Sequence, residues 1–214
     1  MSSQLVKYPR TPHLPWSPGG TKDDSFLIDV SHFEGREVVV TEKMDGENTS
    51  LYQDHYHARS LDGRHHPSRD WVKAFHAGIA SEIPEGWRLC GENLYAQHSI
   101  IYDDLRSYFY LFSVWNDQNV ALNWDDTLEW VDLLGVDVVP ELYRGEFDRH
   151  AIEALELDLE RQEGYVVRVT DAFAFKDFAD SVAKWVRPHH VQTDQHWMYA
   201  EIVPNRLAQR KEKE

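Results

Sequence analysis

Short runs of β-branched and aromatic residues constrain the fold of this chain more than any other feature. Such strand-length runs cover residues 36–42, 49–58, 87–94, 108–115, 164–170 and 181–187. Apolar residues recur at helical spacing in 71–80 and in 124–135, where Gly135 is the expected C-cap, and a third helix is expected over 148–160. Because strands and helices do not alternate strictly, as they do in a parallel sheet, the pattern predicts an α+β fold with antiparallel strands.

The length and composition predict one compact domain. The chain has 214 residues, 42% of them hydrophobic, which is enough for one buried core. No apolar run reaches the roughly 18 residues of a membrane helix, and the first ten residues do not resemble a signal peptide. We therefore expect a cytoplasmic protein. The lone cysteine, Cys90, cannot form an internal disulfide and is expected to be a small core residue.

The charge balance argues against a simple nucleic-acid-binding module. The chain carries 37 acidic and 22 basic residues, a formal net charge of −15. Such a chain would repel a polyanion as a whole. If it binds nucleic acid, it needs a local basic groove, with its acidic residues on other faces or used to hold metal ions.

Five short segments stand out beside the predicted strands. They are T-E-K-M-D-G-E-N at 41–48, A-R-S at 58–60, G-E-N-L-Y at 91–95, Q-E-G-Y-V-V-R at 162–168 and A-K-W-V-R-P at 183–188. Each one alone is weak evidence, and an isolated K-x-D-G is more often a surface turn with a solvated lysine. In this order, and each beside a strand, the five segments predict one shared groove.

In this order the segments resemble the covalent nucleotidyltransferase superfamily of polynucleotide ligases and RNA-capping enzymes. Within it, the chain is most similar to ATP-dependent RNA ligases of the RNA ligase 2 type, over about residues 5–190. The resemblance implies an adenylyltransferase (ATP-grasp-like nucleotidyltransferase) domain in which antiparallel sheets flank a nucleotide groove, with peripheral helices. The catalytic domain would span 1–190, including an irregular N-terminal arm over 1–35. A polar, partly helical tail over 191–214 would follow, with no separate OB or C-terminal domain.

The resemblance assigns the chemistry to a lysine nucleophile, Lys43, which would attack the α-phosphorus of ATP. An amine attacks only when unprotonated, and a free lysine has a pKa of about 10.4, so we expect the site to lower it. By resemblance, Lys184 and a Mg²⁺ or Mn²⁺ ion held by Glu163 would both disfavour a charged Lys43. They would also neutralise charge on the phosphate oxygens.

The remaining matches would serve nucleotide recognition. By resemblance they are Glu42 for the adenine amino group, Asp45 in the nucleophile motif, Asn48 for the 5′-phosphate end, Arg59 for the ribose or the strand ends, and Glu92 for the ribose hydroxyls. Phe112 would stack on the purine, which offers a flat π face. A plain core role for Phe112 stays open, and a register slip would exchange it with a neighbouring aromatic residue.

The last of the five segments departs from the family pattern. The family commonly has two lysines spaced K-x-K, whereas Lys184 is followed here by Val186 and then Arg187. Either Arg187 substitutes from a shifted position, or one phosphate contact is absent. Since arginine keeps its charge at any pH, we expect phosphate binding to survive.

The resemblance therefore implies an ATP-dependent RNA ligase acting on RNA ends or nicked RNA through a lysyl-AMP intermediate. A DNA ligase and a GTP-using capping guanylyltransferase are the alternatives within the same class. A catalytically degenerate module that binds nucleotide or RNA ends is the alternative outside it. The contacts that bind the RNA substrate would come from the groove, from the basic stretch 62–69 or from a partner protein. A zinc site is disfavoured, because the twelve histidines come without cysteine pairs or an H-E-x-x-H motif.

Overall fold

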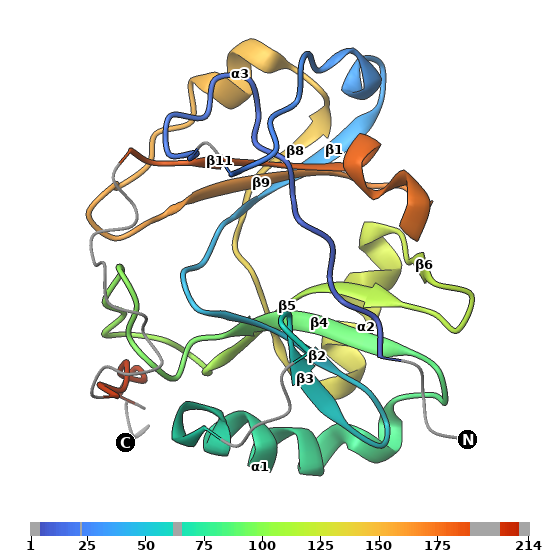
Figure 1. Ribbon diagram of the computed structural model, residues 1–214, viewed down its shortest axis with the longest axis vertical. Helices are drawn as coiled ribbons and strands as arrows, with labels where there is room; N and C mark the ends of the chain where they lie inside the picture. Colours follow the sequence, from blue (N-terminus) through green and yellow to red (C-terminus); the bar gives the residue numbers. More distant parts are fainter. Residues whose placement is uncertain (1–4, 22, 62–65, 189–201, 210–214) are drawn as a thin grey trace, which may run out of the picture.

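Two β-sheets lie one above the other and enclose the centre of the molecule (Figure 1). The computed structural model describes residues 5–21, 23–61, 66–188 and 202–209. The smaller sheet has the strand order β11-β9-β1-β8 and is antiparallel throughout. Its strands are β1 (Glu37–Glu42), β8 (Glu141–Glu146), β9 (Gly164–Val169) and β11 (Val182–Val186).

The larger sheet has the strand order β10-β6-β5-β4-β2-β3, with β7 paired to β5 as the one parallel addition described. Its strands are β2 (Glu47–Leu51), β3 (Tyr56–Ala58), β4 (Arg88–Asn93), β5 (Phe109–Trp115), β6 (Val120–Ala121), β7 (Asp137–Val138) and β10 (Phe173–Ala174). The α+β fold with antiparallel sheets predicted from the sequence is confirmed.

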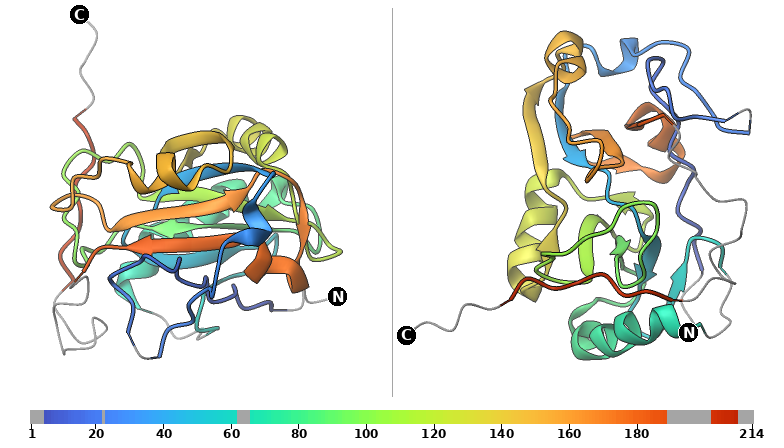
Figure 2. Two further views of the ribbon diagram at one scale, coloured as in Figure 1. Left: turned by 90° about the horizontal axis from the view of Figure 1, so that it is seen from above. Right: turned by 90° about the vertical axis from the view of Figure 1, so that its left-hand side faces the viewer.

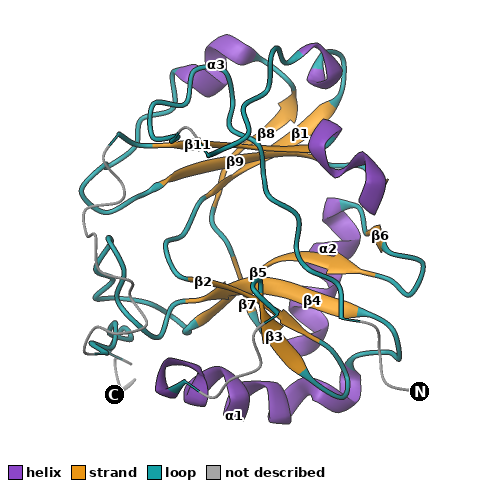
Figure 3. Cartoon of the chain, viewed as in Figure 1, coloured by secondary structure: helices purple, strands orange, loops and turns teal. Residues whose placement is uncertain are grey.

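Helices lie at the periphery (Figure 3). The helix α1 (Asp70–Ile79) and the helix α2 (Trp124–Leu134) contribute Val72 and Val131 to a core cluster with the larger sheet. This cluster lies on the face of that sheet away from the smaller one. The short α3 (Arg149–Glu153) lies beside β8, and four 3-10 turns, Ser31–Phe33, Pro67–Arg69, Ala80–Glu82 and Phe175–Asp180, complete the elements. In the described part of the chain, every helix is too short and too polar to cross a membrane.

The predicted helix ends are confirmed for α2, where local chemistry decides them. The Asn123 side chain accepts a hydrogen bond from the Asp126 N–H at 2.8 Å, which satisfies a free donor of the first turn. At the other end Gly135 has φ +61°, the left-handed conformation in which glycine carries no steric cost.

Several predicted elements were wrong in extent. The run 49–58 is two strands, because the chain turns back at 52–55, where the Tyr52 N–H donates to the His55 carbonyl at 2.8 Å. The helix expected over 148–160 ends at Glu153, and residues 158–161 form a turn instead. Strand β8 was missed because it is an edge strand whose side chains are mostly exposed, so apolar alternation is absent.

The C-terminal tail forms no helix within its described part, residues 202–209. It pairs instead through the isolated bridges Ala96↔Pro204 and Leu105↔Leu207. Asn205 explains the extended course, because its buried side-chain amide donates to the Leu94 carbonyl at 2.8 Å and its oxygen accepts from a backbone N–H at 2.9 Å. The rest of the predicted tail lies outside the described residues.

The N-terminal arm is irregular, as predicted, yet it is bound closely to the fold (Figure 2). It runs along β11, where the Leu14 N–H donates to the Lys184 carbonyl at 2.8 Å and the Lys184 N–H donates to the Pro12 carbonyl at 2.9 Å. Tyr8 and Leu14 are buried in a core cluster to which strands of both sheets contribute. That cluster also contains Cys90, whose predicted core position is confirmed.

Candidate active site

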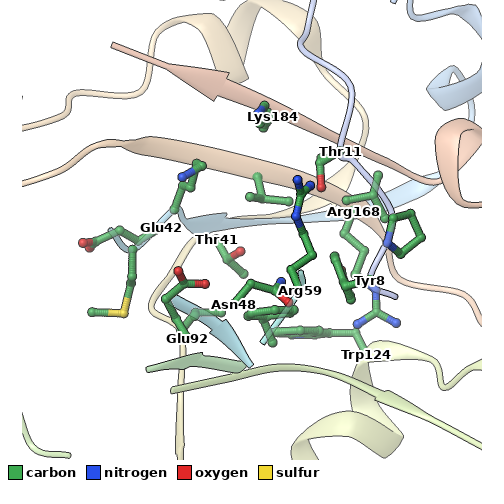
Figure 4. A pocket seen from close by; sticks show the side chains of 17 residues that line it. Tyr8, Thr11, Thr41, Glu42, Asn48, Arg59, Glu92, Trp124, Arg168 and Lys184 are labelled. Carbon is green, nitrogen blue, oxygen red and sulfur yellow. The ribbon is translucent and has the colours of Figure 1, made fainter. Parts of the chain in front are cut away.

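A cavity of about 250 Å³ lies between the two sheets (Figure 4). Most of the residues predicted from the sequence line it, namely Glu42, Lys43, Asn48, Arg59, Glu92, Phe112 and Lys184. Glu163 does not line the cavity but contacts Lys43. Segments that are 140 residues apart in the chain therefore meet around one space, as predicted.

Lys43 follows directly after β1 and is held at the junction of the sheets. Its N–H donates to the Gly164 carbonyl at 2.9 Å. Any side chain at Gly164 would clash, because a Cβ there would lie 2.0 Å from the Trp185 carbonyl oxygen. The glycine of the E-G-Y-V-V-R segment thus lets β9 pass close to β11 while its carbonyl orients the lysine backbone.

The smaller sheet presents one row of side chains to the cavity. In the strand register, Thr41 pairs with Val166 and Val166 pairs with Lys184, so these three residues lie side by side across β1, β9 and β11. All three line the cavity. The register therefore places the Lys184 ammonium group on the same face as the end of β1, from which Lys43 emerges.

The larger sheet forms the opposite wall. Asn48 on β2 and Glu92 on β4 are direct cross-strand partners. Arg59 follows β3, and its N–H donates to the Asn48 carbonyl at 3.0 Å. Phe112 is the unpaired residue of a bulge in β5, between the pairs formed by Leu111 and Ser113. A bulge redirects a side chain, and this one turns Phe112 to the cavity.

Lys43 and Glu163 form an ion pair in which the Lys43 ammonium group donates to the Glu163 carboxylate. Burial by itself lowers the pKa of Lys43, but the carboxylates of Glu163, Glu92 and Asp45 raise it, and the net shift is upward. The expectation that the site lowers this pKa is therefore wrong for the protein without its ligands. The physical reason is that three acidic side chains surround the Lys43 ammonium group. Their attraction outweighs the effect of burial.

The other titratable groups show how unevenly charge is distributed. Burial, reinforced by Glu163 and Asp45, raises the pKa of Glu92 to about 8, although Lys43 opposes the shift. Burial and the neighbouring Lys43 lower the pKa of Lys184.

Besides Glu163, two predicted site residues lie outside the cavity, namely Asp45 and Arg187. The Asp45 carboxylate accepts hydrogen bonds from the Ser99 N–H at 2.7 Å and the Ile100 N–H at 2.9 Å, so it holds the loop that follows β4. The Arg187 guanidinium donates to the Leu159 carbonyl at 2.7 Å. Because side chains alternate along β11, Arg187 does not continue the face that presents Lys184.

Arg168 is the main site residue that the sequence analysis missed. It lies two positions after Val166 on β9, lines the cavity and is 5% exposed. Burial lowers its pKa to about 10. Its guanidinium lies 5.4 Å from the Trp124 ring and donates to the Leu122 carbonyl, while its Nε and Nη1 have no partner among the described residues. The period of two along E-G-Y-V-V-R could have found it.

A second cavity, of about 360 Å³, adjoins the first and shares Thr11, Arg59 and Lys184 with it. Arg10 also lines it, so three cationic side chains gather here in a chain with a net charge of −15. No described residue of the basic stretch 62–69 lines this second cavity. Residues 62–65 lie outside the described part, and Arg69 donates to the Glu47 carboxylate at 2.8 Å.

Metal ligands are sparse. Within the described residues, no group of three or more His, Cys, Asp or Glu side chains is placed to hold a metal ion. A Mg²⁺ or Mn²⁺ ion, in contrast, needs only one or two carboxylates when substrate phosphates supply other ligands, and Glu163 fits that requirement.

The fold resembles that of several solved RNA ligase structures from Naegleria gruberi. A mutant of that ligase with ATP and Mn matches with a TM-score of 0.54 and 18% identity, covering 86% of this chain and 61% of that chain. The same ligase with PPi matches with a TM-score of 0.53 and 21% identity, covering 73% of this chain and 51% of that chain. At this identity the likeness shows the fold alone, and the chain spans about half the length of these relatives.

Two further comparisons concern sequence. No match was found among curated proteins. The family model described as RNA ligase matches residues 36–186, from just before β1 to the end of β11. The match covers well over half of the 214 residues and includes both walls of the cavity. The chain therefore belongs to the RNA ligase family.

Proposed function

We propose that the protein is an ATP-dependent RNA ligase that uses Lys43 as its nucleophile. The lysine nitrogen attacks the α-phosphorus of ATP, a P–N bond forms and pyrophosphate leaves. AMP then passes to an RNA 5′-phosphate, and a 3′-hydroxyl displaces it to make the phosphodiester. The observation that carries the proposal is the single cavity that brings Lys43 together with Lys184, Arg59 and an aromatic slot.

The inner end of the cavity suits a purine base. Phe112 and Val166 line opposite walls, so a flat ring fits between them. At the edge of the slot, Glu42 would accept from an adenine amino group, and the Gln162 amide already donates to its carboxylate at 2.8 Å. The unpartnered donors of Arg168 favour a base with a ring acceptor. Ring acceptors are present in both purines, but at C6 adenine carries an amino group that donates to a carboxylate, where guanine carries a carbonyl oxygen, so Glu42 supports ATP over the GTP of a capping enzyme.

The Lys43–Glu163 pair supplies a route to an uncharged nucleophile. In the ligand-free protein the ammonium group is stabilised chiefly by Glu163. When Glu163 is engaged by a Mg²⁺ or Mn²⁺ ion, which would also neutralise the triphosphate, Lys43 loses that stabilisation. Burial then acts unopposed by Glu163 and favours the free amine. Lys184, on the same face, would stabilise the charge that builds on the phosphate oxygens.

The choice of RNA rests on the family and on Asn48, which lines the cavity beside Arg59. A DNA ligase remains the alternative substrate class. A degenerate binding module is disfavoured, since Lys43 and Lys184 line one cavity, Glu163 contacts Lys43, and no member of this set of three is missing. A cytoplasmic location and a partner protein that grips the substrate remain predictions from the sequence.

Covalent labelling tests the proposal directly. Incubation with Mg²⁺ and ATP labelled at the α-phosphate should label the wild-type protein, and Lys43→Ala should abolish the label because no other amine is placed at the cavity in the same way. Lys73→Ala on the exposed face of α1 is the matched control and should label normally. A label that persists in Lys43→Ala would remove this lysine from its role. Labelled GTP in place of ATP, and nicked DNA in place of nicked RNA, test the two alternatives within the class.

A further inference from the structure

The N-terminal arm carries an arginine to the cationic cavity next to the nucleotide site. The cavity is lined by two passes of the arm, with Arg10 and Thr11 on the first and residues 23–25 on the second. Arg59 and Lys184 complete it from the two sheets and belong to both cavities. A group bound at Lys43 therefore has a direct path into this second space, between Arg59 and Lys184.

The three cations of this cavity form no close ion pair in the described part of the chain, although Asp24 acts on Lys184 and Arg59 from farther away. Among the described residues, no carboxylate lies within ion-pair distance of Arg10, Arg59 or Lys184. Arg10 donates only to the backbone carbonyl of Asp23, at 3.3 Å. Burial and the neighbouring Arg10 lower the pKa of Arg59, which places the two guanidinium groups close to each other. An arrangement of this kind is stabilised when an anion enters.

Asp23 and Asp24 are the acidic residues that an anion would meet in this cavity, and the Asp24 carboxylate already has hydrogen-bond donors. One of its oxygens accepts from both the Thr21 N–H and the Thr21 hydroxyl, each at 2.9 Å. The same oxygen lies 3.8 Å from the His13 ring. The carboxylate is thus held on its own turn of the arm, and the three cations remain available to a ligand.

We propose that Arg10, Arg59 and Lys184 form a subsite for a phosphate group that is not joined to Lys43. Arg10 is the contribution of the N-terminal arm, and its guanidinium can bind phosphate oxygens in a bidentate manner. Two groups have this chemistry in the proposed reaction, namely the pyrophosphate that leaves in the first step and the RNA 5′-phosphate that accepts AMP in the second. The inference rests on the proposed function and adds a residue and a phosphate position to it.

Arg10→Gln removes the charge from the arm and keeps the length of the side chain, while Lys7→Ala is the matched control. Lys7 is an exposed cation of the same arm that lines neither cavity. Both variants and the wild type are loaded with AMP and freed of ATP. In the first arm, pyrophosphate is added: its oxygen attacks the α-phosphorus, the P–N bond to Lys43 breaks, ATP forms and the amine regains a proton. In the second arm, a 5′-phosphorylated nicked RNA receives the AMP.

Arg10→Gln should raise the half-saturating concentration of at least one of the two substrates about tenfold, as expected for one lost charge-assisted contact. An effect on pyrophosphate alone identifies the leaving group as the occupant, and an effect on RNA alone identifies the 5′-phosphate. If Arg10→Gln behaves like Lys7→Ala in both arms, the subsite is refuted.

Direct binding separates this inference from the proposed function. Calorimetric titration of the unmodified protein with inorganic pyrophosphate needs no covalent chemistry, and the affinity should fall about tenfold in Arg10→Gln but stay unchanged in Lys7→Ala. An unlabelled wild type that still shows this difference would refute the ligase and support the subsite. In the opposite outcome, the wild type is labelled, and Arg10→Gln and Lys7→Ala bind pyrophosphate equally and lose AMP equally in both arms. That outcome would support the ligase and refute the subsite.

Discussion

The two ends of the active site differ in how their charges are balanced. At the Lys43 end, one ammonium group is surrounded by Glu163, Glu92 and Asp45, and its pKa is raised. At the other end, Lys184 and Arg59 have no ion pair among the described residues, and the pKa of each is lowered by burial and by neighbouring cations. Lys43, the proposed nucleophile, is therefore held in its charged form, while the proposed phosphate-binding end has cations available for an anion. Activation has to come with the ligands.

The strongest test of this contrast is the removal of the cation on β11. Lys184→Ala should lower the rate of Lys43 labelling by about 100-fold, because one preorganised donor to the phosphate oxygens is lost. The initial rate at saturating ATP measures the effect. Lys176→Ala, an exposed lysine in the neighbouring 3-10 turn, is the control. Equal rates for the two variants would show that the unpaired cation plays no part in the first step.

The acidic end is tested through the pH dependence of labelling. Glu163 raises the pKa of Lys43, so Glu163→Gln should lower this pKa and shift the alkaline rise of the labelling rate to lower pH. The plateau should also fall if Glu163 holds the metal ion. Glu160→Gln, exposed in the same loop, serves as the control. A pH midpoint that does not move would mean that Glu163 does not set the charge of Lys43.

The smallest expected effect concerns stability. The pKa of Glu92 is raised from 4.5 to about 8, so the folded state binds the proton more tightly than the unfolded state. The contribution of Glu92 to folding therefore weakens as pH rises from about 5 to 8. Between pH 6 and 7 the free energy of unfolding of the wild type should fall by about 1 kcal/mol more than that of Glu92→Gln. Urea denaturation at both pH values measures this, and parallel curves would contradict the shift.

Local patterns predicted the frame of the site. Strands β1, β4, β5, β9 and β11 were recognised because they are buried and rich in β-branched or aromatic residues. Strand β8 has no such pattern, since it is an edge strand without a fully buried side chain, and only Leu142 and Tyr143 pack in part against the core. The hairpin between β2 and β3 depends on a turn at 52–55 that carries no glycine or proline.

Individual side chains show where prediction from sequence ends. Phe112 reaches the cavity through a β-bulge, which the alternation of residues along the strand does not predict. Its neighbours Tyr110 and Phe109 are buried in two separate core clusters. Asp45 lies two residues from Lys43, yet it bonds to Ser99 because the loop after β4 folds back onto it. Arg10 belongs to the N-terminal arm, whose sequence predicts only irregular structure. Tertiary contacts place this arm beside the site.

The sequence by itself determined the class of fold and the order of the five segments, and it supplied Lys43 as the proposed nucleophile, because strand periodicity and short motifs are properties of neighbouring residues. The tertiary structure alone decided the charge on Lys43, the orientation of Asp45 and Arg187, and the meeting of Arg10 with Arg59 and Lys184. Those features depend on burial and on electrostatic interactions between residues far apart in the chain, and neither can be calculated until the two sheets and the arm have been placed together.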